Sequence, residues 1–286
     1  LHVSENNIVR ATAGEAVVSG ISHNGMWTID AQEIQIEPRV TLRGAFFRKP
    51  GSTATVLYFG GNGFVLSKHY RYLLSIYEDL PVDVIAFDHR GYGGSTGTAE
   101  LDALMKDGLL IHDHVKSLST VSAKPLIVHG HSLGSFVAGN IARHRTLDGL
   151  VLESSATSTE EWAQGFTERT RWIRKVVTVV PDLSLQGKGN SGVMATLNEP
   201  ILIVVGRDDT TTRPEMSEAL FEQAAVPGDW KELLVVEGAH HMNASRGTAY
   251  REAFLRLAAR AASRIDERQL SRRSFISPKT QVRTRF

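Results

Sequence analysis

The stretch that decides the fold is "VHGHSLGSF", residues 128–136, with Ser132 at the centre of "GHSLG". The G-x-S-x-G pattern is typical of a nucleophile elbow, a sharp turn that joins a strand to a helix and exposes a serine. A second match, "GGSTG" (93–97), is centred on Ser95. The pattern alone leaves three interpretations: Ser132 is a nucleophile, Ser95 is one, or both are ordinary turn residues.

The flanking residues distinguish the two serines. An elbow requires a strand directly before the serine, a helix directly after it, and very small residues two positions away on each side. Ser132 follows the apolar run "PLIV" and precedes the helical pattern "FVAGNIARH", with Gly130 and Gly134 on its two sides. Before Ser95, the residues "HRGYGG" separate the serine from a strand that ends near Asp88. Ser132 is therefore the candidate nucleophile, and Ser95 is expected in a loop.

Apolar runs alternate with helical patterns along most of the chain, which favours an α/β fold. Strands without polar positions, separated by helices, are typical of a mostly parallel central sheet covered by helices on both faces. The expected strands are residues 53–59, 82–88, 125–130, 147–154, 199–206 and 230–238. The expected helices are residues 67–80, 98–119, 133–144, 213–225 and 245–263.

The chain divides into a main domain with additions at both ends. Residues 1–52 contain short alternating runs, which predict antiparallel strands added to one sheet edge. Residues 53–264 form the α/β domain, and 155–198, longer than one crossover requires, are expected to form a short lid or cap. Residues 265–286 are polar and basic, so we expect a weakly structured tail, with contact to nucleic acid or a membrane as the alternative.

The composition excludes several classes of protein. A length of 286 residues and a 42% hydrophobic fraction fit one α/β domain with a large core. The formal net charge of +1 gives no reason to expect a nucleic-acid partner, and no apolar run is long enough to span a bilayer. The absence of cysteine excludes disulfides and a thiol nucleophile. The chain begins at Leu1, so an N-terminal segment is expected to have been removed or left out, and the compartment, cytoplasmic or extracytoplasmic, stays open.

A catalytic serine needs a histidine base that is itself oriented by a carboxylate. Asp208 and Asp209 follow the expected strand 199–206, while His240 and His241 follow the strand 230–238. Carboxyl ends of parallel strands meet at one edge of the sheet, where α/β proteins form their sites. Both pairs are therefore expected near the serine, and the residues alone do not decide within each pair.

Acyl transfer also requires donors for a developing oxyanion. The backbone N–H of Leu133, directly after the serine, is one candidate. The loop "GGNG" (60–63) follows the strand 53–59, and the amide of Asn62 is the second candidate. Gly61 and Gly63 would let this backbone approach a substrate closely.

Three further side chains are candidates for substrate contact. His131 lies beside the serine and is expected near the pocket floor. Trp162 and Phe166 belong to the expected lid, where they would form an apolar wall for an acyl chain or simply pack on the core. We predict no metal site and no cofactor, because His129 and His131 lack a visible partner set for zinc and no nucleotide-binding glycine motif follows the first strand.

Residues 40–263 resemble an α/β-hydrolase, and the resemblance rests on six blocks. These are "LYFGGNG", "FDHRGYGGSTG", "GHSLG", "LVLESSATS", "GRDD" and "GAHH". The chain is most similar to the small-lid serine esterase branch, which includes acyl-protein thioesterase-like members. The G-x-x-D and G-A-x-H patterns of such relatives imply Asp209 as the acid and His241 as the base. The resemblance implies that Glu153, at the end of its strand, is usually not the acid, but it stays an alternative because some hydrolases take the acid from that strand. This chain departs from many relatives by having Gly60 where they have histidine and His240 where a small residue is usual.

The resemblance implies a serine hydrolase that acts on a small-molecule carboxylic ester or thioester through an acyl-enzyme, without a cofactor. A peptidase or amidase of the same fold is one alternative. A ligand receptor or scaffold that keeps the fold without turnover is the other. Nothing in the sequence indicates an oligomeric state.

Overall fold

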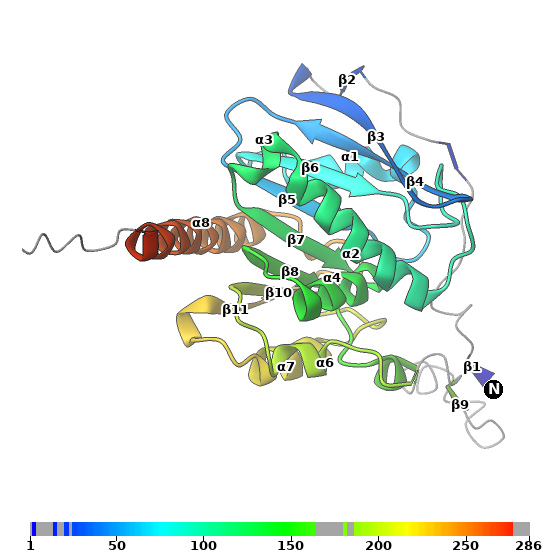
Figure 1. Cartoon of the computed structure of the whole chain (residues 1–286). Helices are drawn as coiled ribbons and strands as arrows, with labels where there is room; N and C mark the ends of the chain where they lie inside the picture. The colour runs from blue at the N-terminus through cyan, green and yellow to red at the C-terminus, as the bar shows by residue number, and fades with distance from the viewer. Residues whose placement is uncertain are drawn as a thin grey trace, which may run out of the picture.

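A computed structural model of the chain describes six stretches, residues 2–3, 14–15, 20–22, 25–163, 180–181 and 186–276. Within them, nine strands form one sheet in the order β11-β10-β8-β7-β5-β6-β4-β3-β2 (Figure 1). The strands are β2 (Gly20–Ser22), β3 (Trp27–Glu37), β4 (Val40–Arg48), β5 (Ala54–Phe59), β6 (Val82–Phe87), β7 (Leu126–His131), β8 (Gly149–Glu153), β10 (Ile201–Gly206) and β11 (Lys231–Val236). A separate parallel pair joins β1 (His2–Val3) to β9 (Val180–Pro181).

The six strands from β6 to β11 in this order are parallel, and the remaining three are antiparallel. Every residue of β5, β6, β7, β8 and β10 is buried, as expected for strands covered on both faces. Strand β3, in contrast, alternates buried or half-buried with exposed positions over much of its length, because one of its faces meets water. This mixed sheet confirms the predicted fold class.

Helices cover both faces of the sheet (Figure 1). Apolar side chains of α2, α4, α6 and α7 form one core with one sheet face, and those of α1 and α8 form a second core with the other. The helices are α1 (Leu66–Ile76), α2 (Leu101–Ser117), α3 (Ser119–Ser122), α4 (Leu133–His144), α6 (Ser191–Met194), α7 (Pro214–Gln223) and α8 (Thr248–Ile276). Across the part of the chain that the structure describes, no helix combines the length and apolar character needed to cross a bilayer.

Helix α8 corrects the predicted start of the C-terminal tail. It continues to Ile276, twelve residues beyond the predicted boundary at 264. Arginine, glutamate, glutamine and leucine in this extension are good helix formers, although their polarity suggested a tail. Arg264 and Arg268 also tie the helix to the domain, through Glu199 at 3.4 Å and Asp148 at 3.2 Å. Residues 277–286 lie outside the described residues, as do residues 164–179 and 182–185 of the expected lid.

Candidate active site

Ser132 occupies a strained turn between β7 and α4. Its backbone has φ 51° and ψ −117°, a conformation that non-glycine residues rarely adopt. The turn has no room for larger neighbours: a Cβ on Gly130 would lie 2.4 Å from the Gly134 carbonyl oxygen, and one on Gly134 would lie 2.0 Å from the Phe59 carbonyl oxygen. The residue pattern thus produces the predicted strand–turn–helix and exposes the serine at the carboxyl edge of the sheet.

Replacement of Gly134 with alanine is expected to lower the free energy of unfolding by about 3 kcal/mol, the upper end for overpacking, because the clash is with rigid backbone. Gly149→Ala is the matched control, since a Cβ on this buried glycine would meet its nearest neighbours at 3.5 Å. Urea denaturation curves of both variants measure the difference. Equal midpoints would contradict this account of the turn.

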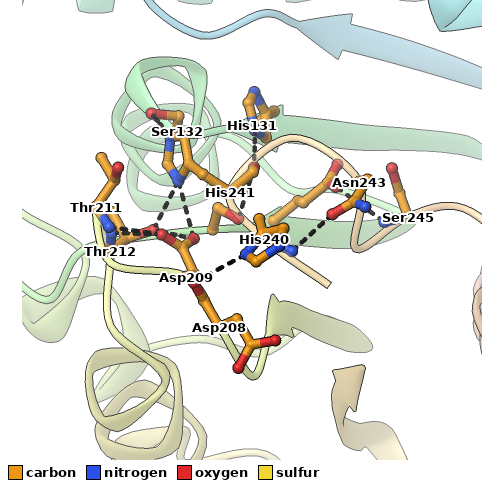
Figure 2. A network of polar contacts seen from close by, with 12 residues as sticks. His131, Ser132, Asp208, Asp209, Thr211, Thr212, His240, His241, Asn243 and Ser245 are labelled. Atoms are coloured by element: carbon orange, nitrogen blue, oxygen red, sulfur yellow. Dashed lines mark hydrogen bonds and ion pairs between the residues drawn. The ribbon is translucent and has the colours of Figure 1, made fainter. Parts of the chain in front are cut away.

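His241 and Asp209 lie in line with Ser132 (Figure 2). The loop after β11 carries His241, whose Nε2 is 2.9 Å from Ser132 Oγ. The loop after β10 carries Asp209, whose Oδ2 is 2.8 Å from His241 Nδ1. The neighbouring pair, Asp208 and His240, is exposed and makes a different contact, between His240 Nδ1 and the Asp208 carbonyl oxygen at 3.3 Å. The structure therefore brings together the aspartate and histidine that the resemblance implied.

The surroundings of Asp209 keep its carboxylate ionised. Burial alone would raise the pKa of Asp209, but hydrogen bonds from His241 and from the backbone amides of Thr211 and Thr212 lower it below its ordinary value. Those amides lie 2.7 and 3.0 Å from Oδ1, and the Thr212 hydroxyl donates to Oδ2 at 2.9 Å. An ionised Asp209 accepts the Nδ1 proton of His241, which leaves Nε2 able to accept a proton from Ser132.

A cavity of about 540 Å³ opens onto Ser132 and His241. Of the residues predicted to contact substrate or an oxyanion, Gly61, Asn62, Gly63, His131, Leu133 and Trp162 line it. The predicted contact of Phe166 falls outside the described residues. The cavity is also lined by residues that no sequence pattern indicated, namely Tyr58, Phe64, His69, Tyr72, Phe136, Ala156, Thr211, Thr212 and Met242. Most of these come from elements far apart in sequence, so no local pattern brings them together.

His131 faces the cavity and also contacts the backbone of the catalytic loop. It is buried, and its Nε2 lies 2.9 Å from the His241 carbonyl oxygen. Burial lowers the pKa of His131, so the ring is neutral near pH 7 and donates its Nε2 proton to that carbonyl. Within the described residues, no group of three or more His, Cys, Asp or Glu side chains is arranged to hold a metal ion.

The "GGNG" loop is held close to Ser132 by residues that the sequence analysis did not single out. A Cβ on Gly61 would lie 3.2 Å from Ser132 Cβ, which shows how near this backbone comes. His89 Nε2 is 3.0 Å from the Gly60 carbonyl oxygen, and the Tyr92 hydroxyl donates to Asn62 Oδ1 at 2.9 Å. The oxyanion role of the Leu133 and Asn62 amides stays a prediction.

The loop that supplies His89 and Tyr92 also contains the second G-x-S-x-G serine. Ser95 is buried, donates to the Asp88 carbonyl oxygen at 2.8 Å and accepts from the Arg43 amide at 2.9 Å. Its hydroxyl therefore has a structural role within the loop.

The alternative acid, Glu153, lies at the end of β8 and is buried. Its two carboxylate oxygens lie within hydrogen-bonding distance of His129 Nε2, at 3.1 Å, and of the Ser245 amide, at 3.0 Å. The ring of His241 instead meets the carboxylate of Asp209.

Comparison with known proteins agrees with this architecture. The family model described as "Serine aminopeptidase, S33" matches residues 66–199. Lysophosphatidylserine lipase ABHD12 of Danio rerio is 26% identical over 74% of this chain, and the match spans only 56% of the longer relative. The uncharacterized protein YfhR of Escherichia coli is 24% identical, with 79% of each chain covered.

Among solved structures, an esterase of Pyrococcus furiosus superposes with a TM-score of 0.64 at 20% identity, covering 90% of this chain and 96% of the other. At this identity the likeness shows the fold. It agrees with the strand–turn–helix around Ser132 and with the family model that matches residues 66–199. The chain has the fold of the α/β-hydrolase superfamily.

Proposed function

We propose that this chain is a serine hydrolase that cleaves a carboxylic ester or thioester through an acyl-enzyme. The observation that supports this most strongly is the hydrogen-bonded series from Ser132 to His241 to Asp209 at the mouth of the cavity. The assignment to the acyl-protein thioesterase-like branch stays a prediction, as does the function of residues 155–198 as a lid.

In the proposed reaction, His241 Nε2 removes the Ser132 hydroxyl proton as Oγ attacks the substrate carbonyl carbon. The Leu133 and Asn62 amides then stabilise the negative charge on the carbonyl oxygen. The tetrahedral intermediate collapses, His241 gives the proton to the departing alcohol or thiol, and the acyl group stays on Ser132. Water, deprotonated by His241, releases the acid in the second half of the reaction. Asp209 stabilises the imidazolium at both stages.

The lining of the cavity supports an ester substrate over a peptide. Phe64, Leu133, Phe136, Trp162 and Met242 supply apolar surface suited to an acyl chain. An aminopeptidase needs carboxylates to bind the substrate ammonium group, whereas no acidic side chain is among the described residues that line this cavity. The lipase name of the Danio rerio relative also supports an acyl ester. The name of the matching family model supports the peptidase as second candidate.

The kinetic test compares p-nitrophenyl esters of increasing acyl length with aminoacyl p-nitroanilides. Each methylene that enters the cavity should raise kcat/KM by up to about fourfold, the equivalent of about 0.8 kcal/mol, until the cavity is full. We expect the anilides to be far poorer substrates. Faster cleavage of the anilides would favour the peptidase, and no turnover of either series would favour a non-catalytic receptor or scaffold.

A further inference from the structure

A buried polar cluster lies behind the proposed active site and takes no part in the reaction described above. It contains Glu153, His129, Tyr77 and Tyr250, each at most 1% exposed. His129 Nε2 is 3.1 Å from Glu153 Oε2, and its Nδ1 contacts the Tyr77 hydroxyl and lies 3.4 Å from that of Tyr250. A buried carboxylate is costly to the fold unless it is hydrogen-bonded. The groups that bond to Glu153 therefore indicate its structural role.

Hydrogen bonds within the cluster satisfy the carboxylate of Glu153. Burial raises the pKa of Tyr77 and of Tyr250, so both phenols stay protonated, and the nearer one, Tyr77, can donate to His129 Nδ1. His129 then carries its own proton on Nε2 and donates it to Glu153. Burial opposes ionisation of Glu153, but the hydrogen bond from His129 lowers its pKa below the ordinary value.

The second carboxylate oxygen leads to the loop that carries His241. Glu153 Oε1 accepts the backbone N–H of Ser245 at 3.0 Å, four residues beyond His241. Earlier in the same loop, the Ser154 hydroxyl donates to the His241 carbonyl oxygen at 3.2 Å, and His131 donates to the same atom. Figure 2 shows His131 beside the loop that carries His241 and Ser245.

Glu153, the last residue of β8, and Ser154, directly after it, thus contact two points of one loop. In a regular strand, consecutive side chains point to opposite faces. Ser154 departs from the strand, with a φ of 48° that non-glycine residues rarely adopt, and its hydroxyl reaches the same loop as the carboxylate of Glu153. This strained turn lies where the chain after β8 contacts the loop that carries His241.

We propose that Glu153 is a positioning residue for the proposed hydrolase reaction. Its carboxylate, oriented by His129, anchors the loop at Ser245 and thereby fixes His241 Nε2 at hydrogen-bonding distance from Ser132 Oγ. A charged acceptor gives a stronger bond to the amide than a neutral one would. This proposal rests on the proposed function, but the anchoring of the loop can be measured without turnover.

The test compares Glu153→Ala with Asp148→Ala. Asp148 is the matched control: it is also a buried carboxylate beside β8, at the opposite end, and it accepts the Leu126 amide at 2.9 Å. Glu153→Ala should lower kcat by about 10- to 100-fold with little change in KM, because a base misplaced by about 1 Å costs such a factor. It should also speed hydrogen exchange in the 238–246 peptide. Asp148→Ala should change neither, despite its lost stability.

Glu153→Gln keeps an acceptor for the Ser245 amide, so it should restore most of kcat and slow loop exchange. The proposal is overturned if Asp148→Ala alters kcat and loop exchange as much as Glu153→Ala, or if Glu153→Ala changes neither. If Glu153→Ala does not fold, hydrogen exchange of the Ser245 backbone amide in the wild-type protein tests the proposal instead. The proposal predicts that this amide is strongly protected from exchange, and unprotected exchange would overturn it. If wild type neither labels at Ser132 nor turns over, the proposed function fails, while exchange in the same variants still decides the anchor.

Discussion

The Ser132→Ala variant is expected to lose about 10⁶-fold in kcat for ester hydrolysis, since the nucleophile and its base act as one unit. The variant should keep its fold, because the hydroxyl faces the cavity and the backbone hydrogen bond from the Ser132 amide to the Glu153 carbonyl oxygen, at 2.9 Å, is unaffected. Steady-state kinetics with a p-nitrophenyl ester measure the loss.

The matched control is Ser95→Ala, which removes the serine of the other G-x-S-x-G. This variant should lose stability, by about 1 to 3 kcal/mol, because it leaves the half-buried Arg43 amide without its acceptor. Its kcat/KM should change little, since its hydroxyl bonds to two backbone groups, the Asp88 carbonyl oxygen and the Arg43 amide, and not to Ser132 or His241. A large loss in Ser95→Ala together with full activity in Ser132→Ala would reverse the assignment.

The Asp209→Asn variant should lower kcat by about 10⁴-fold while leaving KM nearly unchanged. An amide at this position no longer fixes the Nδ1 proton of His241 or stabilises the imidazolium. The Thr211 and Thr212 amides still find an acceptor in the asparagine oxygen, so the fold should be preserved.

Asp208→Asn provides a control of identical chemistry one residue away. Its carboxylate is exposed and points away from the His241 ring (Figure 2), so kcat should be close to that of wild type. Kinetics of the two variants at several pH values measure the difference. If Asp208→Asn were the more damaging change, the acid would be assigned wrongly.

Much of the fold could be predicted because its signals are local. Helix α4 has the predicted bounds, since a strained turn, flanking glycines and a helical apolar pattern coincide around Ser132. The buried strands lack polar alternation, and this fixed their place inside a parallel sheet. The end of α8 was predicted too early, because helix propensity and the distant partners of Arg264 and Arg268 outweigh a polar composition.

The site was predictable only in part, because its remaining contacts join distant segments. Strand order placed two aspartates and two histidines at one edge, but only the resemblance favoured Asp209 and His241 over their neighbours. The bond between Glu153 and the Ser245 amide links residues 92 positions apart, on elements that meet only in the folded chain. No periodicity in the sequence indicates such a contact.

The central claim is that Ser132 is the nucleophile of an acyl-transfer site, and covalent labelling tests it most directly. Wild-type protein treated with a fluorophosphonate should gain the mass of one adduct, and peptide mapping should locate that adduct on Ser132. Ser132→Ala should remain unlabelled, while Ser95→Ala should label like wild type. An adduct on another residue, or a folded wild-type protein that takes up none, would contradict the claim.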